Sequence, residues 1–217
     1  MRNGVGSMFT SEQAVGWVRR TADVVEEHAS ALTKLDAAIG DGDHGTNMAR
    51  GFRAVVQRVD GLTDKDFNSL FKAVAMALIG KVGGASGPLY GSFYMGMGKQ
   101  LGSGDEASDA ELAAALRAGY DSVVTRGKAQ VGDKTMLDAW DPALRALDEA
   151  LEGGAELGTA LDRAAEAAQD GVKATIPMIA RKGRASYLGE RSKDHQDPGA
   201  TSTQLIVQAL ADVVNGR

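Results

Sequence analysis

Apolar residues recur at intervals of three and four along almost the whole chain, which is the spacing of one face of an α-helix. The first pattern starts after Thr10, which with Gln13 has the spacing of a capping box. Pro142 stands where the first position of a sixth helix is expected, with a preceding turn from Leu137, and a seventh helix should end before Pro177. The patterns cover residues 15–32, 48–59, 67–77, 89–97, 108–123, 144–151, 157–172 and 203–214, with Thr63 as a further expected N-cap.

None of the chain alternates with the period of two that is typical of a half-buried strand, so the sequence predicts an all-α fold of about eight helices. Short connections favour antiparallel neighbours, in either an up-and-down bundle or a closed helical barrel. In both, the loops that follow the odd-numbered helices lie at one end. These loops are the glycine-rich, polar segments 36–47, 80–88, 127–136 and 181–199, which predicts a binding site at one rim.

Composition narrows the class of protein. With 217 residues, of which 43% are hydrophobic and 24% charged, the chain is typical of one globular domain, and we expect residues 10–217 to form it behind a flexible leader, residues 1–9. The absence of cysteine excludes disulfides, thiolate metal sites and thiol nucleophiles, and is compatible with a cytoplasmic location. A net charge of −5 disfavours nonspecific nucleic-acid binding, and no apolar stretch is long enough to span a membrane.

Three aspartates, Asp36, Asp41 and Asp43, stand close together in the first of these segments. Carboxylates at this spacing repel one another unless a cation neutralises them, and hard oxygen ligands select Mg²⁺ or Ca²⁺. The alternative is a cluster of turn and capping residues. An EF-hand is excluded, because Phe52 stands where that loop requires its bidentate glutamate.

The segment before Leu89 places glycines and Ser86 directly ahead of a helix, where free backbone N–H groups and the positive helix end suit a phosphate. It is not a Walker A motif, since the glycine–lysine–hydroxyl ending is missing. The alternative is a tight helix contact that small residues permit.

Single residues in the four segments each have more than one interpretation. Met136 is either a contact for a nucleotide base or a core residue, and Arg184 either binds a phosphate or forms a surface ion pair. His44 and His195 lie in these segments and are candidates for a phosphohistidine, a base or a hydrogen-bonding group, whereas His28 lies on a helix.

Four motifs in order carry a resemblance: Asp36–Asn47 (DAAIGDGDHGTN), Gly83–Gly91 (GGASGPLYG), Gly132–Asp138 (GDKTMLD), and Gly183–Gly189 (GRASYLG) with Asp197–Gly199 (DPG). With them the chain resembles, over roughly residues 10–215, the nucleotide-binding L subunit of dihydroxyacetone kinases and the equivalent C-terminal domain of the single-chain enzymes. The resemblance implies a closed barrel of eight antiparallel helices that holds its nucleotide at one rim.

The resemblance also implies roles for individual residues. Asp36, Asp41 and Asp43 would bind two Mg²⁺ ions that bridge the phosphates of ADP or ATP, and Arg184 would assist catalysis. The implied nucleotide contacts are His44, Gly45, Thr46, Asn47, Ala85, Ser86, Gly127, Met136, Arg184, Asp197, Pro198 and Gly199. Ala85 departs from the family, in which a hydroxyl residue is common there, so a contact would come from its backbone N–H.

The implied activity is phosphoryl transfer to dihydroxyacetone, or a related ketose, bound on a separate K subunit. Two phosphoryl donors stay open. In one, ADP is a resident cofactor rephosphorylated in place by a phosphohistidine on an M subunit of the sugar phosphotransferase system. In the other, ATP exchanges as a substrate. A noncatalytic Mg·ADP regulatory adaptor is the alternative from another class, and a homo-oligomer also stays open.

Overall fold

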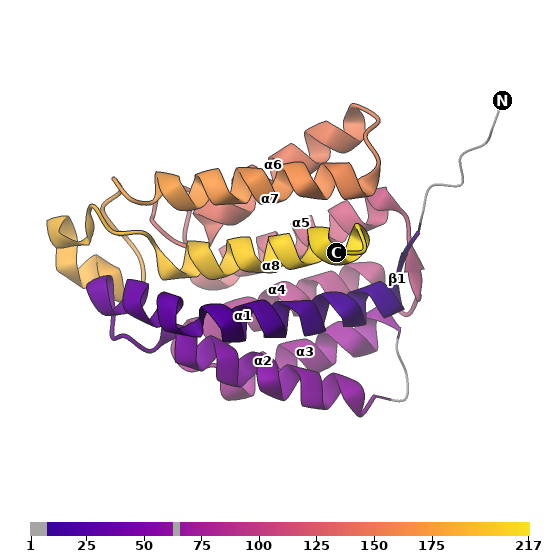
Figure 1. Cartoon of the computed structure of the whole chain (residues 1–217), viewed down its shortest axis with the longest axis horizontal. Coiled ribbons are helices and arrows are strands. Elements are labelled where there is room, and N and C mark those ends of the chain that lie inside the picture. The colour runs from indigo at the N-terminus through magenta and orange to yellow at the C-terminus, as the bar shows by residue number, and fades with distance from the viewer. Residues whose placement is uncertain (1–7, 63–65) are drawn as a thin grey trace.

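The computed structural model describes residues 8–62 and 66–217, and this part of the chain is almost entirely helical (Figure 1). The elements in chain order are β1 (Phe9–Thr10), α1 (Ser11–Ile39), α2 (His44–Asp60), α3 (Phe67–Lys81), α4 (Ser86–Leu101), β2 (Glu106–Ala107), α5 (Asp109–Gly127), α6 (Leu137–Glu152), α7 (Leu157–Ala174), the 3₁₀ helix η1 (Arg184–Ser192) and α8 (Pro198–Val214). The two short strands pair antiparallel. The all-α prediction is confirmed.

Several helices begin at side-chain caps. The Oγ1 atom of Thr10 accepts the N–H of Gln13 at 3.1 Å, and the Gln13 side chain accepts the N–H of Thr10 at 3.0 Å, which confirms the predicted capping box of α1. The same reciprocal bonds begin α5. Helix α3 starts after Asp66, whose carboxylate accepts the Ser69 N–H, whereas the predicted cap Thr63 lies outside the described residues.

Each helix packs against its neighbours in the chain, and α8 packs against both α7 and α1. Figure 1 shows the helices side by side along the long axis of the molecule, with the connections α1–α2, α3–α4 and α5–α6 at its left-hand end together with η1. As the sequence predicts, the four glycine-rich segments therefore lie at one end.

A linked set of aromatic rings forms the centre of the core although aromatic residues make up only 5% of the chain. Trp17 of α1 contacts Phe71 of α3 and Tyr94 of α4, and Phe93 stacks on Trp140 of α6 with ring centroids 4.3 Å apart. All five side chains are buried. Among the described helices, none has the length and apolar character needed to cross a membrane.

The N-terminal segment 1–9 was expected to be a loose leader. Residues 1–7 lie outside the described part of the chain, but Phe9 is fully buried and its ring stacks on Phe67 at 5.9 Å. The folded part of the chain therefore begins before residue 10.

Helix α6 has the expected turn from Leu137, but this turn is the start of the helix itself, so Pro142 lies in the helix interior and not at its first position. The carboxylate of Asp138 starts the helix early by accepting the N–H groups of Gly132 (2.5 Å) and Thr135 (2.8 Å). Pro142 therefore lies in the second turn of α6, where it lacks the N–H that would bond the carbonyl oxygen of Asp138 and where its ring crowds that carbonyl group.

Two further helix ends extend beyond their predictions. Helix α1 runs on so that Asp36 lies in its last turn and not in the following loop. Helix α8 begins at Pro198 and not at Thr203, because Asp197 accepts the Ala200 N–H as an N-cap and proline is favoured in the first turn. Both extensions place motif residues on helix ends.

Candidate active site

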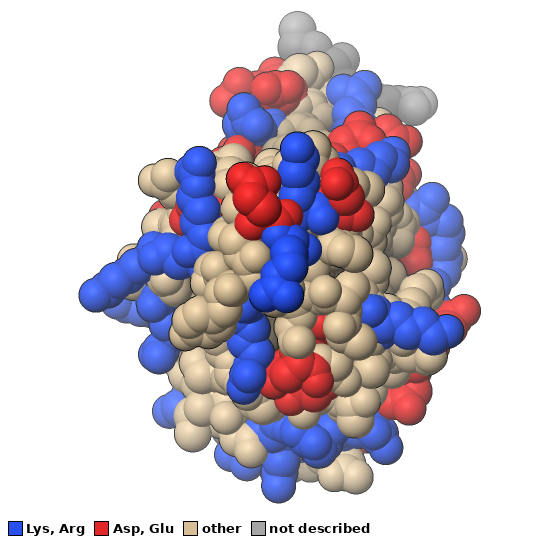
Figure 2. Space-filling model, turned by 90° about the vertical axis from the view of Figure 1, so that its left-hand side faces the viewer, with Lys and Arg blue, Asp and Glu red and all other residues tan. Residues whose placement is uncertain are grey.

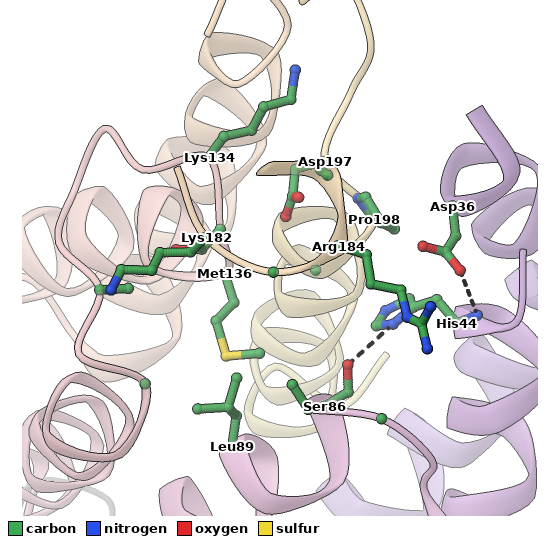
Figure 3. A pocket seen from close by; sticks show the side chains of 18 of the residues that line it. Asp36, His44, Ser86, Leu89, Lys134, Met136, Lys182, Arg184, Asp197 and Pro198 are labelled. Atoms are coloured by element: carbon green, nitrogen blue, oxygen red, sulfur yellow. Dashed lines mark hydrogen bonds between the residues drawn. The ribbon is translucent and has the colours of Figure 1, made fainter. Parts of the chain in front are cut away.

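The four glycine-rich segments surround one cavity of about 450 Å³ (Figure 3). The α1–α2 connection, the turn before α4, the α5–α6 connection and the segment around η1 and the start of α8 each form a part of its wall. Its lining includes Asp36, Ile39, Asp41, Asp43, His44, Asn47, Gly83, Gly84, Ala85, Ser86, Pro88, Leu89, Val123, Arg126, Gly127, Ala129, Lys134, Thr135, Met136, Leu137, Lys182, Gly183, Arg184, Ala185, Asp197, Pro198 and Gly199.

The three aspartates of the first segment gather between α1 and α2. Each of Asp36, Asp41 and Asp43 offers a carboxylate oxygen, and these atoms all lie within 4.8 Å of one another. The buried Asp36 is oriented by the N–H groups of Asp43 (2.8 Å) and His44 (3.1 Å), which both donate to its Oδ2. A Cβ at Gly40 would lie 2.1 Å from Asp36 Oδ1, so a larger residue at this position would displace the Asp36 carboxylate. The donor set is that of a site for a hard divalent cation such as Mg²⁺.

His44 opens α2, and its ring lies between two serines. Its Nε2 is 2.9 Å from Ser202 Oγ of α8, and its Nδ1 is 3.3 Å from Ser86 Oγ of α4. Ser202 in turn lies 2.7 Å from the hydroxyl of the buried Tyr90. Burial lowers the pKa of His44, which the neighbouring aspartates oppose only in part. Because both ring nitrogens are engaged, this geometry favours hydrogen bonding over phosphorylation of the ring.

The second segment forms the turn that leads into α4. Gly84 has a φ of +66°, which favours glycine, and a Cβ at Gly83 would come 2.9 Å from Asn47 Nδ2. Ala85 occupies the N-cap position and, with Ser86, lines the cavity. The first turn of α4 thus faces the cavity, where its backbone N–H groups and the helix dipole favour an anion.

Part of the wall is apolar. The side chains of Met136 and Leu89 point toward one another in Figure 3, and Val123 and Leu137 also line the cavity. Met136 is 5% exposed and belongs at the same time to the hydrophobic core, so its two interpretations are compatible. Such a wall suits the flat face of a nucleotide base.

The fourth segment brings positive charge over the carboxylates. The Nε of Arg184, at the start of η1, lies 2.9 Å from Asp41 Oδ2, and Lys182 lines the same cavity. Helix η1 is anchored to α1 by a small apolar cluster that contains Ala185 and Ile39. Figure 2 shows Lys and Arg side chains spread over this end of the molecule, despite the net charge of −5.

Asp197 stands at the start of α8. Its carboxylate accepts the Ala200 N–H at 2.7 Å, and its own N–H donates to Thr175 Oγ1 at 3.0 Å. Burial raises the pKa of Asp197 to about 7; the negative charge of Asp138 adds to this, and the positive charge of Lys134 opposes it. The carboxyl group is therefore close to its midpoint of titration at neutral pH.

All but two of the predicted site residues line the cavity. Gly45 and Thr46 are not found among the described lining residues. Gly45 lies where α1 and α2 meet, and a Cβ there would come 1.9 Å from the carbonyl oxygen of Ala29, while Thr46 is exposed. His28 bonds to a carbonyl oxygen of its own helix at 2.8 Å, as expected for a helix residue, and His195 is also not found in the lining.

Several lining residues were not among the predicted contacts, and four of them are Leu89, Val123, Lys134 and Lys182. The apolar pattern places the first two on the buried faces of helices, and the structure shows that those faces also reach the cavity. Lys182 stands two positions from Arg184, and Lys134 stands inside the third motif, so their positions in the sequence could have identified both as site residues.

The DAK2 domain family matches residues 38–212. Over 199 residues the chain is 45% identical to a protein of Escherichia coli named PEP-dependent dihydroxyacetone kinase, ADP-binding subunit DhaL, with 92% of this chain and 95% of that one covered. Over 209 residues it is 40% identical to the PTS-dependent dihydroxyacetone kinase, ADP-binding subunit DhaL, of Lactococcus lactis, with 95% and 100% covered.

A solved structure is similar as well, that of the dihydroxyacetone kinase from C. freundii in complex with AMP-PNP and Mg²⁺. The TM-score is 0.72 at 28% identity, and the match covers 98% of this chain. The chain spans 36% of the length of that kinase.

Proposed function

Since the chain belongs to the DAK2 domain family of dihydroxyacetone kinases, we propose that it is the nucleotide-binding subunit of such a kinase. In this proposal the cavity holds ADP or ATP with Mg²⁺, and the γ-phosphoryl group passes to dihydroxyacetone carried by a separate K subunit. The names of the E. coli and L. lactis relatives, both ADP-binding subunits that the chain matches over nearly their whole length, support it.

The observation that carries the proposal is the cluster of three carboxylates within 4.8 Å of one another in the same cavity as the first turn of α4. Asp36, Asp41 and Asp43 would hold two Mg²⁺ ions. Bound Mg²⁺ supplies neutralisation of the phosphate charges and a template for in-line transfer. Arg184, which is paired with Asp41, lies next to this cluster of carboxylates and would bind a phosphate oxygen.

The remaining contacts follow from where each residue lines the cavity. We assign the phosphates to Ser86 and the backbone N–H of Ala85 at the start of α4, with His44 and Asn47 beside them. We assign the base and ribose to the part of the wall that Gly127, Met136 and Asp197 to Gly199 form. Gly45 would act through the packing of α2 against α1 and not through contact with the nucleotide. Thr46, which is exposed beside it, is kept as a proposed nucleotide contact.

The donor in this proposal is a phosphohistidine on an M subunit that rephosphorylates the bound ADP in place. The words "PEP-dependent" and "PTS-dependent" in the names of the relatives favour it. Exchangeable ATP and a noncatalytic Mg·ADP adaptor are outcomes that the experiment below distinguishes. A related ketose is the alternative acceptor, and the K subunit would select it.

We also propose that the eight helices form a closed up-and-down barrel and that residues 10–217, together with the buried Phe9, are one domain. The packing of α8 against both α7 and α1, with every other helix packed against its neighbours in the chain, supports this arrangement.

The test is to purify the protein without added nucleotide, desalt it in magnesium, denature it, and identify any released nucleotide by chromatography. ADP near one equivalent supports the resident cofactor, and an empty protein that binds ATP reversibly supports exchange. A protein that binds neither contradicts the proposal. Tight Mg·ADP binding without phosphate transfer, when K and M subunits are supplied, would favour the adaptor.

A further inference from the structure

The segment between α7 and α8 forms a long loop whose two ends lie close together. The carbonyl oxygens of Met178 and Ser192, at the two ends of this loop, both accept hydrogen bonds from one ammonium group, Lys134 Nζ, at 3.1 and 2.6 Å. Lys182 and Arg184 lie between these ends and line the cavity. Lys134, from the α5–α6 connection, thus closes the neck of the loop 178–192.

The environment of Lys134 is unusual for a lysine. Its side chain is 1% exposed, and Figure 3 shows the ammonium group turned away from Met136. Burial lowers the pKa of Lys134, and the nearby carboxylates of Asp197 and Asp194 favour its charged form. Its backbone has a φ of 62°, in the left-handed region that disfavours residues with a Cβ. A buried charge and a strained backbone at one residue persist only where the surroundings hold them, which points to a function.

Other hydrogen bonds also hold the two ends of the loop 178–192. Ser192 Oγ accepts the N–H of Ala180 at 2.9 Å, and this bond joins the two sides of the loop. The same hydroxyl donates to the carbonyl oxygen of Gly189 at 2.6 Å. The N–H of Arg181 donates to the carbonyl oxygen of Asp133 at 3.0 Å. The loop is therefore attached to the α5–α6 connection at two adjacent residues, 133 and 134, and only the second attaches both of its ends.

We propose that Lys134 is a positioning residue that holds the loop 178–192, and with it Arg184, over the aspartate cluster. The tether itself depends only on the contacts above. Its consequence for ligand binding rests on the proposed function, because it requires that Arg184 binds the nucleotide.

The first test is independent of any ligand. Hydrogen exchange is measured by mass spectrometry on the full chain, comparing the wild type with Lys134→Met, which keeps much of the side-chain volume and removes the ammonium group. The amides of Ala180, Arg181 and Asp194, which are hydrogen-bonded at the neck, should exchange about tenfold faster or more. Unchanged exchange of these amides would overturn the proposal.

A matched control separates tethering from general loss of stability. Val59→Ala creates a cavity in the last turn of α2, far from η1, and should lower global stability without selective exposure of the loop amides. Equal acceleration of the loop amides in Val59→Ala would also overturn the proposal.

The second test measures the affinity for Mg·ADP by calorimetry in a double-mutant cycle. Lys134→Met and Arg184→Ala should each weaken binding about tenfold, but the second change should cost less than about twofold in the background of the first. If the two losses of affinity are additive, Lys134 does not act by positioning Arg184, and the proposal is overturned. A wild type that does not bind Mg·ADP would contradict the proposed function, while hydrogen exchange would still decide on the tether.

Chemical rescue covers the case in which Lys134→Met fails to fold. The chain has no cysteine, so Lys134→Cys can be aminoethylated at that one position in denaturant and refolded, which restores an ammonium group on a side chain of nearly lysine length. Rescue of loop protection and of binding by aminoethylation, but not by an uncharged alkyl group of similar size, is expected. Equal rescue by both reagents would show that Lys134 only fills space.

Discussion

Replacing Asp41 by alanine should separate the chemistry of the cavity from the stability of the fold. The carboxylate of Asp41 meets Arg184 at 2.9 Å, but the two side chains are 35% and 68% exposed, so solvent screens the pair. Such pairs contribute about 0–1 kcal/mol to the free energy of unfolding, and removing one of three clustered carboxylates also relieves repulsion. The midpoint of thermal unfolding should fall by no more than about 4 °C, since 1 kcal/mol corresponds to about 2–4 °C at this chain length.

Magnesium-dependent nucleotide binding should respond far more strongly to the same change. Loss of a residue next to a metal ligand typically lowers metal affinity about 10–100-fold, and we expect loss of a carboxylate ligand itself to exceed about a hundredfold. The assay is calorimetric titration of ADP into Asp41→Ala with magnesium and with chelator. Asp60→Ala is the matched control, because it removes a similarly exposed ion pair, with Arg19 at 2.6 Å, at the other end of α2. Full magnesium-dependent binding by Asp41→Ala would refute the metal assignment.

Four other changes test the packing and electrostatics around the cavity. Gly45→Ala should lower the free energy of unfolding by about 1–3 kcal/mol, because its Cβ would lie 1.9 Å from the Ala29 carbonyl oxygen. Gly80→Ala, whose Cβ would meet open space within α3, should raise it by about 0.5–1 kcal/mol, and equal effects of the two in denaturant unfolding would contradict this explanation. Tyr90→Phe removes hydroxyl contacts to two side chains of α8 at 2.7 and 3.0 Å and should lower the free energy of unfolding by about 0.5–3 kcal/mol in the same assay. An unchanged free energy would contradict a stabilising role for these hydrogen bonds. Asp197 has a pKa raised to about 7 in the folded chain, so it binds its proton more tightly there than in the unfolded chain, and its contribution to stability is present below about pH 4 and lost as the pH rises to about 7. Asp197→Asn should therefore flatten the pH dependence of the unfolding midpoint between these values, and an identical profile would show that Asp197 does not titrate in this range.

Much of the helical pattern is predictable because its signals are local. Thr10 and Gln13 bond to each other's backbone within one turn, and the apolar intervals of three and four record the buried face of each helix. The meeting of the four loops is predictable for a different reason. Short connections alternate between the two ends of a helical array, so glycine-rich loops after odd-numbered helices must come together.

The predicted boundaries of the elements are wrong where contacts between more distant residues override the local sequence pattern. Asp141–Pro142 has the sequence of a helix start, yet α6 begins earlier because the carboxylate of Asp138 collects the N–H groups of Gly132 and Thr135. The sequence places Phe9 in a leader because nothing in its neighbours predicts a strand. Its burial depends on Phe67, which lies far along the chain.

The distinction between Gly45 and Lys134 shows what a motif cannot tell without the structure. Both stand inside motifs, and only Gly45 was expected to contact the nucleotide, but its lack of a Cβ is needed for the approach of α2 to Ala29. The partners of Lys134 are main-chain carbonyl oxygens 44 and 58 residues away. Every residue carries such an acceptor, so no residue type at the far end marks the contact in the sequence. A motif therefore locates residues that matter to a site, while the three-dimensional contacts decide whether each one binds the ligand or holds the groups that do.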